Sequence, residues 1–160
     1  MRTYIGIDNG VSGSIGIITP TQVQFIKTPT VTELDYTKEK KNVTRIDFQK
    51  LIEILSSHSP LTTFVALERP MVNPGRWVAT MSAIRCHEVT LVALQLLKLP
   101  YCYIDSKEWQ KELLPKSCEK LFLKSASLDI GNRLYPQFED FKHLDRDGLL
   151  IATYCKRKNL

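Results

Sequence analysis

The chain has 160 residues, a length typical of one domain, and we expect residues 1–160 to form a single domain. With 43% hydrophobic residues it can bury about 70% of the surface of the unfolded chain, which excludes disorder as its main state. The 22 Lys and Arg residues exceed the 17 Asp and Glu residues, and the net charge of +5 is compatible with a polyanionic partner.

The four cysteines lie far apart and form no CxxC pair, so the sequence predicts neither a zinc knuckle nor a secreted disulfide framework. The first residues resemble a strand and carry no charged leader or apolar signal segment, so we expect a cytoplasmic protein with reduced thiols. The longest apolar stretch, residues 89–99, is too short to span a bilayer, and we expect no membrane association.

The first part of the chain predicts three short β-strands separated by Gly, Asn, Ser, Pro and Thr residues that favour turns. The strands cover residues 3–8, 14–19 and 23–27, and an antiparallel meander is their simplest arrangement. Residues 28–43 are rich in Thr, Lys and Glu without an apolar period, so we expect a surface loop there.

The middle of the chain predicts a strand, a helix and a second strand. An amphipathic helix begins at Asp47, and a short buried strand follows at residues 63–68. A long helix over 79–98 then leads to a strand at 101–105. Because a strand-helix-strand unit joins parallel strands, this part of the sheet should be parallel. The pattern therefore predicts an α/β fold that combines an antiparallel meander with a parallel pair of strands.

The last third of the chain predicts three helices. Asp105 and Glu108 form a capping pattern that opens a short helix, which Pro115 ends. A second helix covers 118–134, and a third covers 143–157.

Three acids stand where a fold would not ordinarily place them. Asp8 and Glu68 each end an apolar strand, and Asp147 lies on the apolar face of the predicted last helix. An ionised carboxylate that is buried needs a cation, hydrogen bonds or a metal, and a hard divalent cation would satisfy all three acids at once. Each also has a local explanation: Asp8 could cap a turn, Glu68 could pair with a distant lysine, and Asp147 could be a helix N-cap.

Four segments in series resemble the RuvC-type Holliday junction resolvases, especially the phage and organellar branches. They are GIDNGVSGSIGI (6–17), VALERP (65–70), IDSKEWQKELLP (104–115) and KHLDRDGLLIATY (142–154). The resemblance implies an RNase H-like α/β fold with a five-stranded mixed sheet flanked by helices. It also implies a homodimer and Mg²⁺-dependent cleavage of two strands of a four-way DNA junction. It implies no organic cofactor.

The resemblance carries over to particular residues, with Asp8, Glu68 and Asp147 matching three metal-binding acids of the family. The sequence departs from the family at the fourth ligand. His143 lies four residues before Asp147, about 40° around a helix, so we expect it to share that face. Asp145 is the second choice if the helix begins only at Asp147. Two Mg²⁺ ions, for which Mn²⁺ can substitute, would be bridged by one carboxylate, for which we favour Asp8.

The resemblance also implies a DNA-binding surface. Lys107 and Lys124 match positions where the family contacts phosphates. Met71 and Trp77 fall where resolvases open the junction centre by stacking or wedging, and Arg76 could contact a phosphate. Trp77 could equally belong to the core.

Two other functions use the same sheet topology. The first motif also resembles the phosphate loop of actin-like and Hsp70-like ATPases, although these enclose ATP between two such domains and 160 residues supply one. A nuclease with relaxed specificity for flaps, other branched DNA or RNA–DNA hybrids is the second alternative.

Overall fold

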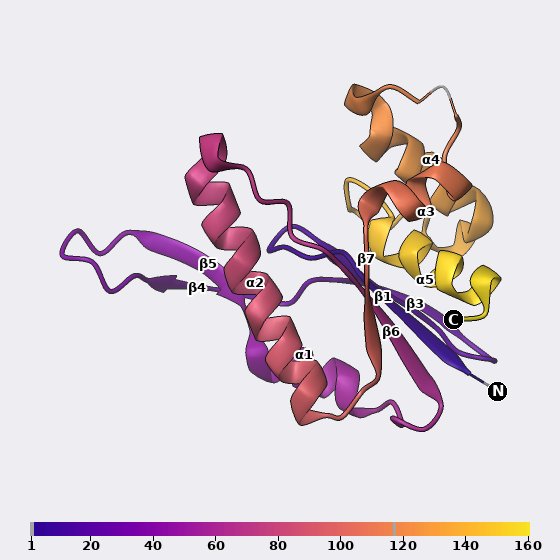
Figure 1. The fold of residues 1–160 in the computed structure, drawn as a ribbon, viewed down its shortest axis with the longest axis horizontal. Coiled ribbons are helices and arrows are strands. Elements are labelled where there is room, and N and C mark those ends of the chain that lie inside the picture. The colour runs from indigo at the N-terminus through magenta and orange to yellow at the C-terminus, as the bar shows by residue number, and fades with distance from the viewer. Residues whose placement is uncertain (1, 117) are drawn as a thin grey trace.

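The computed structural model describes residues 2–116 and 118–160, and its centre is a mixed five-stranded sheet (Figure 1). The strand order is β3-β2-β1-β6-β7, in which β1, β2 and β3 are antiparallel neighbours and β6 and β7 run parallel to β1. This confirms the predicted fold class. The strands are β1 (Thr3–Ile7), β2 (Ser14–Ile18), β3 (Val23–Lys27), β6 (Thr63–Glu68) and β7 (Tyr101–Ile104).

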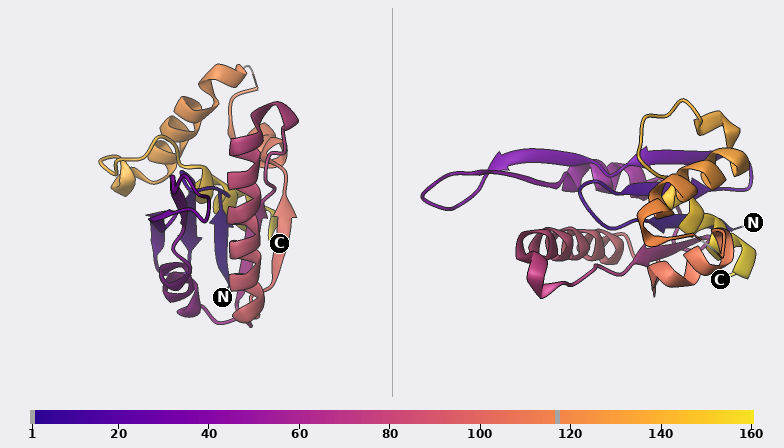
Figure 2. Two further views of the ribbon diagram at one scale, coloured as in Figure 1. Left: turned by 90° about the vertical axis from the view of Figure 1, so that its left-hand side faces the viewer. Right: turned by 90° about the horizontal axis from the view of Figure 1, so that it is seen from above.

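Helices cover both faces of the sheet, which explains why every residue of β1 and β2 is buried (Figures 1 and 2). On one face, Ile5 and Ile7 of β1 pack into a core cluster with residues of α1 and α2. On the other face, Tyr4 packs with residues of α3 and α5, among them the buried Trp109. The helices are α1 (Phe48–Ser56), α2 (Trp77–Leu96), α3 (Ser106–Leu113), α4 (Leu123–Leu134) and α5 (Asp147–Lys158).

Glycines allow the backbone of α5 to lie directly on β1 and β2. A Cβ atom added to Gly6 would lie 2.3 Å from the carbonyl oxygen of Gly148, and one added to Gly16 would lie 2.3 Å from the Cα of Leu149. Since no side chain fits in this space, glycine is required at these positions. The close packing brings the first residue of α5, Asp147, to the end of the sheet at which β1, β3, β6 and β7 terminate. We call this end the sheet edge.

The prediction of a surface loop at residues 28–43 is wrong, because most of this segment forms an antiparallel hairpin. Its strands are β4 (Thr30–Leu34) and β5 (Asn42–Ile46), and the hairpin projects away from the five-stranded sheet (Figure 1). Ile46 is the only buried residue in these two strands. A hairpin with solvent on both faces needs no apolar alternation, and its β-branched residues are the signal that the sequence does carry.

Two predicted helices begin later than expected. Helix α4 begins at Leu123, after a 3₁₀ turn at Lys120–Phe122, rather than at residue 118, so Lys120 does not share a helix with Lys124. Helix α5 begins at Asp147 rather than at residue 143, because Arg146 has non-helical backbone angles. Helix α2 begins at Trp77, two residues before the predicted start, and follows a 3₁₀ turn at Pro74–Arg76.

We find no helix among residues 2–116 and 118–160 that combines the length and apolar character needed to cross a membrane. The remaining short element, a 3₁₀ turn at Pro136–Phe138, links α4 to the loop before α5.

Candidate metal centre

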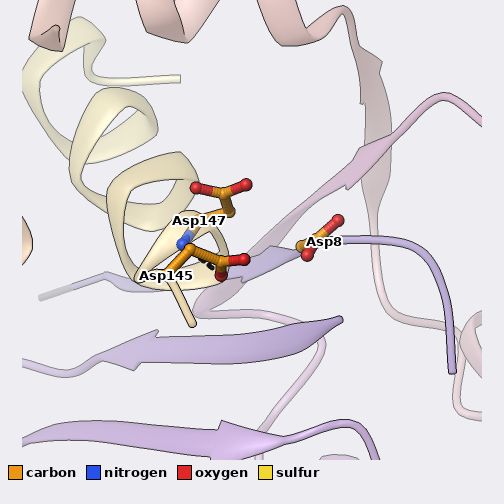
Figure 3. Close-up of side chains that lie close together, drawn as sticks. All are labelled: Asp8, Asp145 and Asp147. Carbon is orange, nitrogen blue, oxygen red and sulfur yellow. Dashed lines mark hydrogen bonds between the residues drawn. The ribbon is translucent and has the colours of Figure 1, made fainter. Parts of the chain in front are cut away.

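Three aspartates from opposite ends of the chain meet at one edge of the sheet (Figure 3). Asp8 follows β1, Asp147 opens α5, and Asp145 lies in the loop just before that helix. One carboxylate oxygen from each lies within 4.8 Å of the other two. The backbone N–H of Asp147 also donates to Oδ1 of Asp145 at 3.3 Å, which fixes the two C-terminal acids relative to each other.

The fourth acid, Glu68, ends β6 beside Asp8, because β6 pairs in parallel with β1. The indole Nε1 of Trp109 donates a hydrogen bond of 2.9 Å to Oε1 of Glu68. Burial raises the pKa of Glu68, and the hydrogen bonds from Trp109 and Asp8 oppose that rise. The proximity of Glu68 raises the pKa of Asp8 in turn, so the two acids belong to one electrostatic cluster.

The cluster holds more negative charge than its surroundings compensate. Burial raises the pKa of Asp8 well above its ordinary value, and Glu68 and Asp145 raise it further. The pKa of Asp147 is raised to about 7, mainly by burial and then by the negative charges of Asp145 and Asp8. The Ser127 hydroxyl donates a hydrogen bond to the Asp147 carboxylate, which opposes this rise. Closely spaced, oxygen-only acceptors of like charge are the donor set that hard divalent cations such as Mg²⁺ prefer. The residues present therefore fit such an ion.

The geometry removes the reason for choosing His143 over Asp145 as a metal ligand. Because α5 begins at Asp147, His143 lies in the preceding loop and the helical register that favoured it does not exist. Its Nε2 lies 3.3 Å from the carbonyl oxygen of Gly13, and the N–H of Asp145 donates to its Nδ1 at 3.4 Å. The same Nδ1 lies 3.3 Å from Oδ1 of the Asp145 carboxylate. Both ring nitrogens thus contact protein groups, while the fully buried Asp145 joins the acidic group.

Lys124, which sequence reasoning assigned to DNA phosphates, lies inside the site. Its Nζ is 3.2 Å from Oδ2 of Asp145, and the side chain remains 61% exposed. Partial burial lowers the pKa of Lys124, but Asp145 outweighs this effect and the net shift is upward. This cation compensates part of the negative charge.

Sequence reasoning missed three residues that hold the acids in place. Trp109 and Ser127 donate to Glu68 and Asp147, and no pattern in the sequence marks either of them. Arg146 is fully buried, and its guanidinium donates to the carbonyl oxygens of Phe138, Phe141 and Asp145. The position of Arg146 between two aspartates is the signal that the sequence carries for it. A buried guanidinium needs several acceptors, which the loop before α5 supplies.

The remaining predicted DNA-binding residues lie at the surface. Lys107 is exposed on α3. Met71 and Trp77 are 73% and 67% exposed, in and just after the segment that links β6 to α2, so the core interpretation of Trp77 is wrong. Arg76, directly before α2, is exposed as well.

The mixed sheet, with acids after β1, at the end of β6 and at the start of the last helix, defines an RNase H-like fold. Solved structures of RuvC share it. RuvC of Thermus thermophilus in complex with a Holliday junction substrate is 13% identical, with a TM-score of 0.59 over 99% of this chain and 96% of that chain. Another Thermus thermophilus RuvC structure is 14% identical, with a TM-score of 0.54 over 99% and 97%.

The chain therefore has the RuvC fold, as its sequence motifs predict. No protein-family model and no curated protein sequence matches it.

Proposed function

We propose that this protein is a divalent-metal-dependent endonuclease that resolves four-way DNA junctions. The observation that carries the proposal is the meeting of Asp8, Glu68, Asp145 and Asp147 at one sheet edge of a RuvC fold. The similar RuvC structure that contains a Holliday junction substrate supports branched DNA as the substrate class. A cluster of acids alone repels phosphate. Bound cations would reverse this repulsion, and the cluster then suits phosphodiester chemistry.

The four acids would hold the metal, with Asp145 rather than His143 as the fourth ligand. Two Mg²⁺ or Mn²⁺ ions bound there would lower the pKa of a water molecule and stabilise the 3′ oxygen that leaves. Trp109 and Ser127 orient two of the acids through hydrogen bonds, which restricts their rotamers. His143 contacts both the backbone N–H and the carboxylate of Asp145 and would orient this acid as well.

Lysines on α3 and in the loop after it would bind the DNA backbone. Lys107, Lys111 and Lys116 line one cavity of about 480 Å³ between α3 and the start of α4, and no acid is among its described lining residues. Such a surface favours phosphate groups. Met71 and Trp77 expose apolar side chains that could stack on bases at the junction centre, with Arg76 beside them for a phosphate.

A homodimer through α2 would provide two active sites for two strands. This helix has apolar residues around its whole circumference, and Val78, Val92 and Leu96 are 82%, 52% and 63% exposed. Arg85 and Glu88 lie on the same exposed side. In an antiparallel two-fold pairing of α2, Arg85 would meet Glu88 of the partner subunit, and the apolar ends would pair as well.

The decisive experiment is cleavage of a labelled mobile four-way junction in Mg²⁺, with a flap and an RNA–DNA hybrid as competing substrates. We expect paired cuts near the junction centre, and we expect Asp8→Asn to abolish them while junction binding persists. Glu68→Gln should behave alike. Equal cleavage of the hybrid would contradict junction resolution and favour a nuclease with relaxed specificity. Full activity of Asp8→Asn would remove the acidic cluster from the mechanism.

A further inference from the structure

A second cavity opens beside the acidic cluster, on the β3 side of the sheet. It has a volume of about 580 Å³, and three segments form it: residues 11–13 before β2, residues 27–30 from the end of β3 to the start of β4, and residues 142–144 before α5. Its lining residues are Val11, Ser12, Gly13, Lys27, Thr28, Thr30, Lys142, His143 and Leu144.

The charge of this cavity has one sign. Lys27 and Lys142 both line it, and none of its described lining residues is an acid. Within residues 2–116 and 118–160, neither lysine forms an ion pair with a carboxylate. Lys27 lies 5.8 Å from the ring centroid of Phe141 instead. Two ammonium groups without a counter-charge favour an anionic ligand.

A buried hydroxyl in the same wall also lacks a partner. Thr28 is only 8% exposed, and its Oγ1 makes no hydrogen bond within the described part of the chain. Its backbone N–H is already used, since it donates to the carbonyl oxygen of Gly13 at 3.1 Å. An unpaired buried hydroxyl is costly, so a ligand oxygen that accepts its proton would stabilise the folded protein.

The cavity lies within a few nucleotides of the acids along the sheet edge. Strand β3 runs in the same direction as β1, so Lys27 at the end of β3 and Asp8 after β1 lie at the same edge, with β2 between them. Two strand spacings amount to about 10 Å. The wall of the cavity is also connected to the cluster, because His143 contacts both Gly13 and Asp145.

We infer that this cavity binds a backbone phosphate of the DNA strand that is cut, on the side of the acids opposite to Lys107. The inference rests on the proposed function for the identity of its ligand. It gives the sheet edge a sequence of charges, with Lys27 and Lys142 on β3's side, the acids in the middle, and Lys107 after β7. A DNA strand along this edge would have a phosphate held on each side of the bond that breaks.

The test measures junction binding by Lys27→Gln/Lys142→Gln without Mg²⁺, so that it does not depend on cleavage. Loss of one phosphate contact should reduce the slope of log affinity against log salt concentration by about 1. Thr28→Val should weaken binding without changing that slope. Lys156→Gln is the matched control, because Lys156 lies near the far end of α5, about 14 Å from Asp147; it should leave affinity and slope unchanged.

Failure of this inference and failure of the proposed function give different results. If the wild-type protein cleaves junctions and the double variant has an unchanged salt slope, the phosphate site alone is overturned. A reduced slope in a protein that cleaves no junction would support the site and overturn the function. Inorganic phosphate provides a further arm: if it shifts the NMR signals of the Gly13 and Thr30 amides and DNA does not, the cavity binds free phosphate and the inference is wrong.

Discussion

Trp109, a core residue of α3, donates its indole N–H to the Glu68 carboxylate at 2.9 Å. The ring is 1% exposed, so its packing fixes the direction of the hydrogen bond and thereby the position of an acid at the end of β6. The hydrophobic core under the sheet therefore determines part of the geometry of the candidate metal centre.

Trp109→Phe should raise the Mg²⁺ concentration needed for half-maximal cleavage by about 10- to 100-fold, because Glu68 loses its orienting donor. The measurement is the cleavage rate of a junction as a function of Mg²⁺ concentration. Leu113→Ala is the control, since Leu113 packs in the same cluster. It should lower stability without changing the Mg²⁺ requirement; an equal change in both variants would assign the effect to packing.

Asp145→Asn and His143→Gln should differ in severity. Asp145 belongs to the acidic group, whereas His143 contacts the backbone and the carboxylate of Asp145 from outside that group, so we expect a near-complete loss of cleavage in the first variant. The second should lose about 10- to 100-fold, the usual effect of removing an orienting partner. Cleavage rates measured side by side at saturating Mg²⁺ decide the matter. A severe loss confined to His143→Gln would make the histidine the ligand.

The metal-free protein should lose stability as the pH rises from about 4 to 7. The pKa of Asp147 is raised from 3.8 to about 7, so the folded state binds more protons than the unfolded state in this range, and stability falls as they dissociate. Asp147→Asn should reduce this dependence, although Asp8 and Glu68 still contribute because their pKa values are raised too. At pH 8 in EDTA the variant should be more stable than wild type, by up to about 4 kcal/mol.

Thermal unfolding between pH 4 and 8 measures this effect, and added Mg²⁺ at pH 8 should raise the melting temperature of the wild type more than that of Asp147→Asn. A wild-type melting temperature that rises between pH 4 and 7 in EDTA would contradict the assigned direction of the Asp147 shift.

Gly16→Ala should destabilise the protein by about 3 kcal/mol or more, because the new Cβ would lie 2.3 Å from the Cα of Leu149, and backbone cannot move aside easily. Urea unfolding measures the loss. Gly75→Ala is the control, since its Cβ would approach a side-chain atom, Oδ1 of Asn73, at 3.3 Å. Similar losses in both would show that α5 can shift away from the sheet at little cost.

The sequence carried enough information to predict the sheet, because five apolar strands alternate with turns and helices, and it marked Asp8, Glu68 and Asp147 by their apolar surroundings. It could not place Asp145, because the start of α5 depends on distant groups. Arg146 leaves the helix to donate to carbonyl groups of the preceding loop. The Ser127 hydroxyl also accepts the N–H of Arg146, and such tertiary hydrogen bonds have no local pattern.

The acids reach the site from segments made early and late in synthesis. Asp8 and Glu68 leave the ribosome long before Asp147, and α5 can dock only after its glycine contacts with β1 and β2 can form. A nascent chain that lacks α5 therefore lacks Asp147, the acid that completes the cluster. If the proposed function is correct, nuclease activity begins only when this helix is in place, and an incomplete chain is harmless to DNA.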